Sequence, residues 1–377
     1  MTRRIEMRKT FKFRLFPTRG QRTKLKATLE GCRRAYNLCL QIRRDAYQND
    51  GVSLSLYDTG RMVKDWRTDD PIIGACHTHL IQNVCERVQL AFQAFWRRCK
   101  NGENPGYPRF KSEDRYDSFT FKDPARGFSL RGDRTLRLSG IGDVRIKKHR
   151  SLEGTIRRLT IWRDGTGTWF ACFSVDVEEK VLPPSHDAIG IDVGIEKFAV
   201  MSDGTRVENP RFLKQDEKRL KKVQRQLSES LRGSERRRNK RKAFQKTWKK
   251  VENRRKDFAH KLSRQVVNAF GIICVEKLDI KGMTEDNWRS LNRNIHDVAW
   301  GRFRQYLSYK AEEAGRVLVA VDPRYTSRMC SGCGEMVFKP LDQRVHSCPH
   351  CGLEMDRDLN AAINILRRGL ASLPEAA

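Results

Sequence analysis

Two cysteine pairs near the end of the chain have the spacing of a metal site. Cys330 and Cys333 form one C-x2-C pair, and Cys348 and Cys351 form a second pair after fourteen intervening residues. A glycine follows each pair, and glycine permits the tight turn in which two neighbouring thiolates bind one metal. Four thiolates fill a tetrahedral shell, which is typical of structural rather than catalytic zinc. We therefore predict one structural Zn2+, held in a ribbon too small to fold without it.

Two histidines lie close to these cysteines. His346 and His350 are chemically suited to replace a cysteine as a zinc ligand. Because the four thiolates already complete the shell, we interpret both histidines as solvated loop residues.

Carboxylates in three separate segments form a second candidate site. Asp192 lies in a short apolar strand, "GIDVG", and Glu276 stands at the end of a second apolar strand, where the next buried side chain is expected. Asp356 and Asp358 begin an amphipathic helix after the last cysteine pair. Such elements can bring three carboxylates to one edge of a sheet. Two Mg2+ ions about 3.5 to 4 Å apart would there clamp the attacking and leaving oxygens of a phosphodiester, which predicts a nuclease site.

Each of these acids also has an ordinary structural explanation. Taken alone, Glu276 is explained as the first solvated residue after its strand, which either pairs with Lys277 or caps the segment that follows. Asp358 is explained as the N-cap of the last helix, a position that favours aspartate. Only the combination of the three segments favours a metal site.

The charge of the chain points to a polyanionic partner. The 377 residues include 76 Lys and Arg against 46 Asp and Glu, a formal net charge of +30. This excess is far beyond what solubility requires, so nucleic acid is the expected partner. The segment 211–256 alone contains 20 Lys and Arg against 5 Asp and Glu, and we interpret it as a helical pair, broken near Gly233, with one face directed at phosphates.

Apolar spacing predicts that each helix of this pair also has a packed face. One stripe recurs at Leu220, Val223, Leu227 and Leu231, and a second at Phe244, Trp248 and Val251.

The length and the changing pattern indicate several domains. Residues 10–16 alternate apolar and basic side chains, as in a half-buried strand, and helical periodicity follows at about 21–48 and 77–100. The aromatic residues of these helices are interpreted as core packing. A Gly/Pro-rich connector precedes several short strands that suggest a small barrel or sandwich, and "VLPPS" at 181–185 is a predicted linker. An α/β pattern begins at Ala188.

The sequence also predicts a location. Its N-terminus lacks the apolar core of a signal peptide, and no run of 18 apolar residues occurs. Seven further cysteines stand singly, as small buried residues in a reducing compartment do. We expect a cytoplasmic, nucleoid-associated protein with no membrane contact.

Blocks spread over nearly the whole chain resemble the TnpB family, also called OrfB. Its members act as RNA-guided DNA endonucleases of insertion sequences and are related to the compact type V CRISPR effectors. The similar blocks are "KTFKFRLFPT", "CRRAYNLCL", "NPGYPRFKS", "GIDVGIEKFAV", "VEKLDIKGM", "DVAWGRFRQYLSYKAEEAG", "YTSRMCSGCG" and "CPHCGLEMDRDLNAAINIL".

The resemblance implies a multidomain α+β fold. An N-terminal β-barrel, the wedge domain, would carry an inserted helical recognition lobe, followed by an RNase H-like (RuvC) α/β nuclease domain with an inserted zinc ribbon. The implied boundaries are as follows: first wedge strand 1–17, recognition lobe 18–100, remaining wedge 101–182, nuclease core 187–325 with the basic insertion 211–256, zinc ribbon 326–353, final nuclease segment 354–370 and tail 371–377.

The resemblance also implies roles for particular residues. The three nuclease acids fall on Asp192, Glu276 and Asp358, with two Mg2+ ions, and Asp356 is the nearest rival for the third place. The zinc ion falls on the four cysteines. Gln82 and Thr120 match blocks that contact a short motif beside the DNA target.

The implied partners are a guide RNA derived from the transposon end and double-stranded DNA with that motif, with one protein per RNA. Two other functions remain open. One is a non-catalytic guided or zinc-ribbon DNA-binding regulator that keeps the acids as remnants, and metal-dependent cleavage would distinguish it. The other is a transposase proper that joins strands through the same acids, because RNase H-like folds support both reactions.

Overall fold

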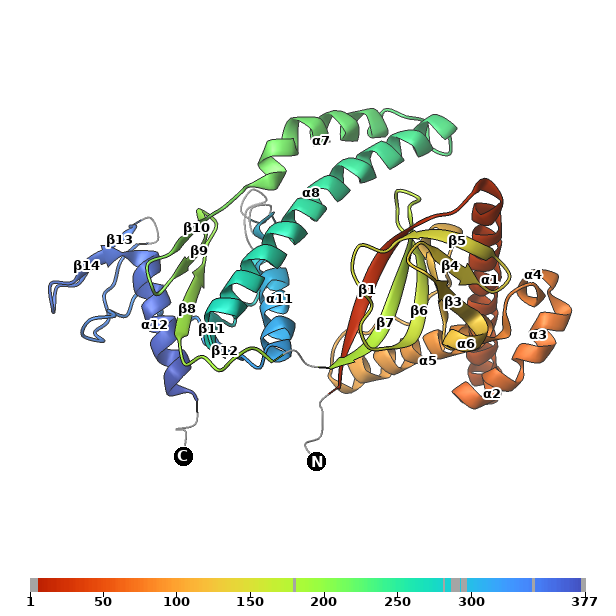
Figure 1. Ribbon diagram of the computed structural model, residues 1–377, viewed down its shortest axis with the longest axis horizontal. Coiled ribbons are helices and arrows are strands. Elements are labelled where there is room, and N and C mark those ends of the chain that lie inside the picture. Colours follow the sequence, from red (N-terminus) through yellow and green to blue (C-terminus); the bar gives the residue numbers. More distant parts are fainter. Residues whose placement is uncertain are drawn as a thin grey trace. The chain divides into compact units, whose positions relative to one another are not determined.

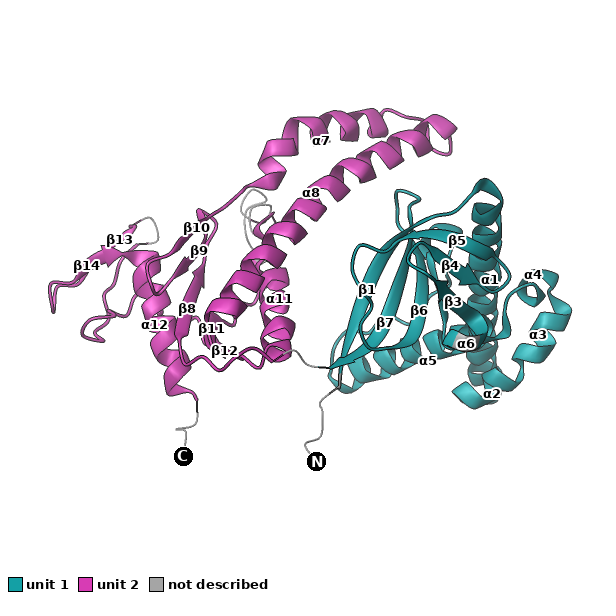
Figure 2. Ribbon diagram, viewed as in Figure 1, with its two compact units in different colours: residues 1–178 teal, residues 179–377 magenta. Residues whose placement is uncertain are grey.

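The computed structural model describes residues 6–178, 181–280, 282–285, 292, 297–340 and 343–373. The chain divides into two compact units, residues 1–178 and 179–377 (Figure 2). Of the expected tail 371–377, residues 374–377 lie outside the described part, as do residues 1–5 of the expected first strand. The finer division of the chain into seven segments stays a prediction.

Unit 1 is built on a seven-stranded antiparallel sheet with the order β2-β6-β7-β1-β5-β4-β3 (Figure 1). The rings of Phe121 in β2 and Phe128 in β3 lie 6.2 Å apart, so the two edge strands meet. The sheet is therefore a nearly closed barrel. Its strands are β1 (Glu6–Phe16), β2 (Ser118–Phe121), β3 (Phe128–Arg131), β4 (Thr135–Leu138), β5 (Gly142–Lys147), β6 (Thr155–Arg163) and β7 (Trp169–Glu178).

The first strand confirms the alternation predicted for residues 10–16. Phe13 and Leu15 are buried in the core, whereas the alternating residues Lys12 and Arg14 are exposed. β1 pairs with β7 along its length and with β5 at its end, which places this N-terminal strand inside the sheet.

A group of helices is inserted between β1 and β2. Thr18 begins α1 with a capping box, in which its hydroxyl accepts the amide of Gln21 and the Gln21 side chain accepts the amide of Thr18. The expected helices at 21–48 and 77–100 are present as α1 and α5, and one apolar core runs from them into the barrel. The helical elements of unit 1 are α1 (Arg19–Asp50), α2 (Leu56–Arg61), α3 (Val63–Asp69), α4 (Pro71–Gly74), α5 (Thr78–Lys100), the 3-10 turn η1 (Glu113–Arg115) and α6 (Pro124–Gly127).

Unit 2 contains a five-stranded mixed sheet with the order β10-β9-β8-β11-β12. β8, β9 and β10 form an antiparallel meander. β11 pairs in parallel with β8, and β12 pairs in parallel with β11. Its elements are β8 (Ala188–Val193), β9 (Lys197–Met201), β10 (Arg206–Glu208), α7 (Phe212–Ser228), α8 (Glu235–Ala269), β11 (Ile272–Glu276), α9 (Gly282–Glu285), α11 (Trp300–Glu313), β12 (Val317–Val321), β13 (Val345–Ser347), β14 (Glu354–Asp356) and α12 (Arg357–Ala371).

Helices cover both faces of this sheet (Figure 1). Ile189 and Ile191 of β8 and Ile273 of β11 belong to a core with residues of α8 and α11 on one face. Cys274 of β11 packs with Ile365 of α12 on the other face. Successive residues of a strand point to opposite faces of the sheet. Every second residue of β8 or β11 therefore faces the same helices.

The basic segment forms a helical hairpin of α7 and α8. Leu213, Leu220 and Val251 form its small apolar core. The predicted packed stripes are wrong for Leu231, which is 79% exposed, and for Trp248, which is 38% exposed. α7 ends at Ser228, so Leu231 lies in the turn before α8 and not on a helix face.

Candidate metal centres

Strands β8 and β11 bring Asp192 and Glu276 to the same edge of the sheet. Their parallel register pairs Gly190 with Cys274 and Ile191 with Val275, and Asp192 beside Glu276 continues that register by one residue. Gly190 and Cys274, two positions earlier, both contact α12. Since side chains two apart share a face, both carboxylates belong to the face that α12 covers.

Helix α12 supplies the third acid. A Cβ on Gly190 would overlap the backbone oxygen of Ala362, so glycine is needed for the helix to approach β8 this closely. Asp358 precedes Ala362 by four residues, about one helical turn. Asp358 therefore lies in the first turn of α12, near the end of β8 that carries Asp192.

The electrostatics of Asp192 show that the three acids share one region. Burial raises the pKa of Asp192 well above its usual range, and the negative charges of Glu276 and Asp358 raise it further. The guanidinium of Arg357 opposes this shift in part. Burial also raises the pKa of Glu276, against a hydrogen bond from Thr326. The negative charges of Asp192 and Glu276 are therefore poorly compensated by the surrounding residues. A divalent cation would stabilise carboxylates in such an environment.

The three carboxylates do not yet form a closed cluster. Within the described part of the chain, only the four cysteines are a group of three or more Asp, Glu, His or Cys side chains close enough to hold an ion as they stand. Mutual repulsion of buried anions favours separation of their oxygens in the absence of a cation. The oxygen-only donor set nevertheless fits Mg2+, which prefers carboxylate and water ligands.

Asp356 has a different role from Asp358. Its carboxylate is the N-cap of α12 and accepts the amides of Asp358 and Leu359. It also forms ion pairs with Lys197 at 2.7 Å and Arg206 at 3.3 Å. Burial raises the pKa of Asp356, but Lys197 and the amides of Asp358 and Leu359 together lower it below its usual range. The prediction that Asp358 caps the helix is therefore wrong, because Asp356 occupies that position and Asp358 lies inside the helix.

A loop that the sequence did not point to holds Glu276. The Thr326 hydroxyl donates to Glu276 Oε1 at 2.7 Å. Two buried asparagines of α12 fix this loop: Asn364 Nδ2 donates to the backbone oxygens of Thr326 at 2.9 Å and Met329 at 2.7 Å, and Asn360 Nδ2 donates to Met329 O at 2.8 Å. Two asparagines four residues apart on the apolar face of "DLNAAIN" were the available signal, because a buried amide needs partners.

The four cysteines have the geometry of a tetrahedral zinc site. Sγ of Cys330 lies 3.7 Å from that of Cys351, and Sγ of Cys333 lies 3.6 Å from that of Cys348. All four sulfurs lie within 4.8 Å of one another. A Zn–S bond of about 2.3 Å in a regular tetrahedron requires sulfurs about 3.8 Å apart, so the arrangement fits Zn2+.

The two cysteine turns have the same backbone conformation. Gly334 and Gly352 have φ angles of 84° and 73°, in the left-handed region that favours glycine. Their amides donate to the carbonyl oxygens of Cys330 and Cys348, each at 2.9 Å.

The nearby histidines differ from each other. His350 is exposed, as expected, but His346 is fully buried in β13, so its interpretation as a solvated loop residue is wrong. Its strand pairs with β14, and its Nδ1 lies 2.7 Å from Lys339 Nζ.

The two residues expected to read DNA lie on neighbouring elements of unit 1. Gln82 is exposed on α5, whereas Thr120 is buried in β2. Thr120 Oγ1 accepts Arg87 Nη2 at 2.9 Å and lies 2.8 Å from Thr160 Oγ1. Arg87 belongs to the same helix as Gln82. Contact of Gln82 and Thr120 with DNA stays a prediction.

Comparison with known proteins then defines the family. Family models match residues 172–287 ("Probable transposase", OrfB type), 300–365 ("Cas12f1-like, TNB domain") and 7–51 ("Helix-turn-helix domain"). A Streptomyces pristinaespiralis protein named "Putative RNA-guided DNA endonuclease" is 30% identical over 373 residues, which covers 97% of this chain and 90% of that protein. The chain belongs to the TnpB (OrfB) family.

Other members and relatives of the TnpB family agree with this assignment. A protein of Escherichia coli K12, "Putative RNA-guided DNA endonuclease InsQ", is 26% identical over 96% of this chain and 92% of its own length. The fold resembles that of a Cas12f1 chain solved with single-guide RNA and target DNA, with a TM-score of 0.60 and 14% identity over 96% of this chain and 98% of that chain. The segment matched as helix-turn-helix contains strand β1 and the long helix α1 in this structure.

Proposed function

We propose that this chain is an RNA-guided DNA endonuclease with an RNase H-like (RuvC) nuclease domain in unit 2. The mixed sheet, with the meander β8-β9-β10 extended in parallel by β11 and β12, supports this domain type. The barrel of unit 1 would be the wedge domain, and its inserted helices would be the recognition lobe. Family membership supports guided DNA cleavage as the activity.

The observation that carries this proposal is the shared position of Asp192, Glu276 and Asp358. The strand register and the close packing of α12 support a common position of the three acids at one edge of the sheet. Burial and mutual charge raise the pKa of Asp192, as expected for a site that is completed by a cation. We assign Asp358 rather than Asp356 as the third ligand, because Asp356 is the N-cap of α12 and pairs closely with Lys197 and Arg206, whereas Asp358 pairs with Arg357 at the longer distance of 3.5 Å.

These residues account for hydrolysis without a side-chain nucleophile. When bound, two Mg2+ ions would polarise the attacking water and neutralise charge on the leaving oxygen. The carboxylates of Asp192, Glu276 and Asp358 would hold them, and Thr326 would keep Glu276 oriented. In the reaction a water oxygen bonds to phosphorus and the P–O3' bond breaks. The water releases a proton and the departing 3' oxygen gains one, which leaves 5'-phosphate and 3'-hydroxyl ends.

The four cysteines would hold one structural Zn2+. Their ribbon contributes only a small apolar cluster around Cys330, Val337 and Cys348, too little to fold without a metal. Ser331 N, directly after the first ligand, donates to Asn360 Oδ1 at 2.8 Å, so the ribbon is attached to the helix that carries Asp358.

The positive charge would bind the guide RNA and the DNA target. In a guided complex, base pairing selects the sequence while the protein contacts backbone and shape. The α7–α8 hairpin supplies a basic surface for these phosphates. Affinity should therefore fall steeply with salt concentration. One protein per RNA and a cytoplasmic, nucleoid-associated location stay predictions; none of the described helices is long and apolar enough to cross a membrane.

The proposal is tested by expressing the protein with DNA that flanks its own gene. The copurified RNA is sequenced, and the complex is incubated with Mg2+ and a plasmid library randomised beside the target. A discrete RNA and depletion of one flanking motif, both with wild-type protein, are expected. Asp192→Ala should bind the same RNA and leave every plasmid uncut. Binding without cleavage by the wild type would instead indicate a guided regulator, and joined strands would indicate a transposase.

A further inference from the structure

Unit 1 contains a cavity that the nuclease account does not use. It lies where the ends of α1 and α5 meet the loop after α5, and it has a volume of about 400 Å3. This volume is in the range of small-ligand pockets. Its lining includes Arg43, Tyr47, Phe92, Phe95, Trp96 and Tyr107.

The walls of the cavity are aromatic and partly open to solvent. The Tyr107 ring lies 5.7 Å from that of Phe92 and 5.4 Å from that of Phe95, edge to face in both cases. Trp96 and Tyr107 are each 44% exposed, and Tyr47 is 65% exposed. The sequence pattern suggested core packing for the aromatic residues of α5. Phe92 is buried as predicted, whereas Trp96, at the rim of the cavity, is not. Flat exposed rings beside a cavity offer stacking surfaces for another flat ring.

A buried cation lines the same cavity. Arg43 is 5% exposed, and its guanidinium carbon lies 4.5 Å from the centre of the Phe92 ring. Arg43 Nη1 donates to Gln89 Oε1 at 2.7 Å. Within the described residues, Arg43 has no ion-pair partner. A guanidinium has five N–H donors, so most of its donor capacity is left for a ligand with acceptor atoms.

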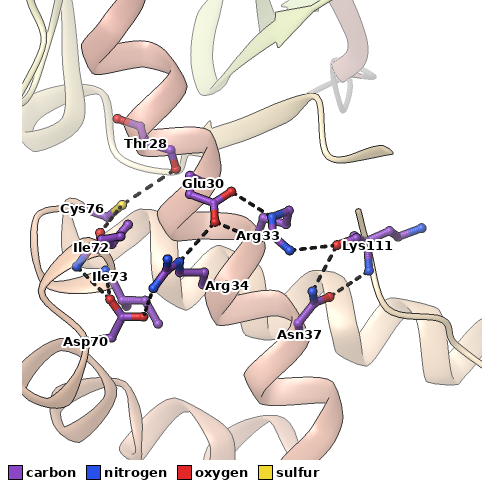
Figure 3. A network of polar contacts seen from close by, with 10 residues as sticks. All are labelled: Thr28, Glu30, Arg33, Arg34, Asn37, Asp70, Ile72, Ile73, Cys76 and Lys111. Atoms are coloured by element: carbon purple, nitrogen blue, oxygen red, sulfur yellow. Dashed lines mark hydrogen bonds and ion pairs between the residues drawn. The ribbon is translucent and has the colours of Figure 1, made fainter. Parts of the chain in front are cut away.

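The loop that carries Tyr107 is fixed to α1 (Figure 3). Lys111 N donates to Asn37 Oδ1 at 2.8 Å, and Asn37 Nδ2 donates to Lys111 O at 3.0 Å. Arg33 Nη1 also donates to Lys111 O, at 3.2 Å, and Arg33 is itself paired with Glu30. The loop is thus anchored at Lys111, four residues after Tyr107. A ligand would therefore not have to order this loop when it binds.

We propose that this cavity captures one unpaired guanine of bound RNA or single-stranded DNA. The base stacks on the aromatic rim, with Trp96 as the principal platform, and Arg43 donates to its O6 and N7 acceptors. An apolar slot with a guanidinium fits guanine best among the bases, because O6 and N7 form the acceptor pair that arginine reads. The strong positive charge of the chain favours a polyanion that brings the base to the cavity.

The proposal rests on the nucleic-acid binding of the proposed function but not on the acid site. It is therefore tested in full-length Asp192→Ala protein without divalent metal, so that loss of cleavage cannot affect the result. The probes are fluorescent thymidine octamers with one central guanine, and the same octamers with 7-deazaguanine, which lacks N7 but keeps the stacking area. Binding is measured by anisotropy over a range of salt concentrations, and a ribonucleotide version of each probe distinguishes RNA from DNA.

The unmodified guanine probe should bind at least fivefold more tightly than the 7-deazaguanine probe. Trp96→Ala should weaken binding of the guanine probe about tenfold, the loss expected for one base–aromatic stack. Its salt dependence should not change, because tryptophan contacts no phosphate. The matched control is Leu90→Ala on the same helix, which is 61% exposed and does not line the cavity.

Two results would overturn the proposal. Equal binding of guanine and 7-deazaguanine by the Asp192→Ala protein with an unaltered cavity would show that Arg43 does not read the acceptor edge. Equal affinities of Trp96→Ala and Leu90→Ala would show that no base stacks at the cavity. Both comparisons can be made whether or not the protein cleaves DNA.

Discussion

The hydroxyl of Thr326 donates a 2.7 Å hydrogen bond to Glu276 Oε1. This contact joins the loop that leads into the zinc ribbon to the end of β11. The same loop is fixed to α12 by Asn360 and Asn364. A side chain outside the acid trio thus connects the two candidate metal centres of unit 2.

Thr326 should position Glu276 and tune its protonation. The hydrogen bond lowers the pKa of Glu276 against the larger effect of burial, so Thr326→Val should raise that pKa further. Cleavage requires the ionised carboxylate, so the acid limb of the pH–rate profile should move to higher pH. The rate near neutral pH should fall about 10- to 100-fold, as for other partners of metal ligands. Thr326→Ser should restore both; an unchanged profile in Thr326→Val would exclude this role.

Removal of the Asp192 charge should stabilise the protein in the absence of metal. The pKa of Asp192 is higher in the folded protein than in the unfolded chain. The stability that comes from this difference is fully present below the pKa of the unfolded chain, and it is lost as the pH rises through the pKa of the folded protein. Asp192→Asn should therefore raise the melting temperature at pH 7, by about 2 to 4 °C for each kcal/mol relieved. The difference should shrink as pH falls toward about 4, the ordinary aspartate pKa.

Magnesium should reverse this order. Added Mg2+ should stabilise the wild type through linkage and have little effect on Asp192→Asn. A wild-type melting temperature above that of Asp192→Asn without metal would contradict the assignment of Asp192 as an uncompensated buried acid.

The neighbouring acids of α12 should separate into structural and catalytic roles. Asp356→Ala removes an N-cap and two ion pairs, so it should lower stability by about 1 kcal/mol or more and keep measurable cleavage. Asp358→Ala should leave the melting temperature nearly unchanged and reduce cleavage at least a thousandfold. Thermal melting and single-turnover cleavage of both variants make the comparison. The opposite pattern would make Asp356 the third ligand.

Loss of zinc should affect the nuclease site as well as the ribbon. Cys348→Ser should reduce bound zinc, and the attachment of Ser331 to Asn360 should weaken with it. Cleavage should then fall strongly, while unit 1 keeps its RNA affinity. Metal analysis and cleavage assays test this, with Cys99→Ser, an exposed cysteine of unit 1, as the control. Full cleavage by zinc-free protein would show that the two centres are independent.

Local patterns were sufficient to predict many elements of the fold. The alternation at residues 10–16 corresponds to β1, and the helical periodicities correspond to α1 and α5. The cysteine spacing predicted the sulfur cluster, because a C-x2-C turn is a local structure. Contacts between distant segments were not predictable in this way. Burial of His346 was missed as well, because the segment that forms the β13–β14 pair was interpreted as a loop.

The candidate acid site was predictable in part. The positions of the acids at two strand ends and one helix start indicated that they would meet at one edge of the sheet. The parallel register of β8 and β11 agrees with this. The choice of N-cap could not be made from sequence, because aspartate suits the position at both 356 and 358. Thr326 was also missed, since a threonine fifty residues from Glu276 carries no local signal of contact.

The most direct test of the central claim is single-turnover cleavage of a matched target by preassembled protein–RNA complexes. Asp192→Ala, Glu276→Gln and Asp358→Ala are compared with the wild type at saturating Mg2+, with target binding measured in parallel. Each variant should bind the target normally and cleave at least a thousandfold more slowly, because all three carboxylates hold the same ions. Cleavage at the wild-type rate by any one of them would contradict the three-acid site.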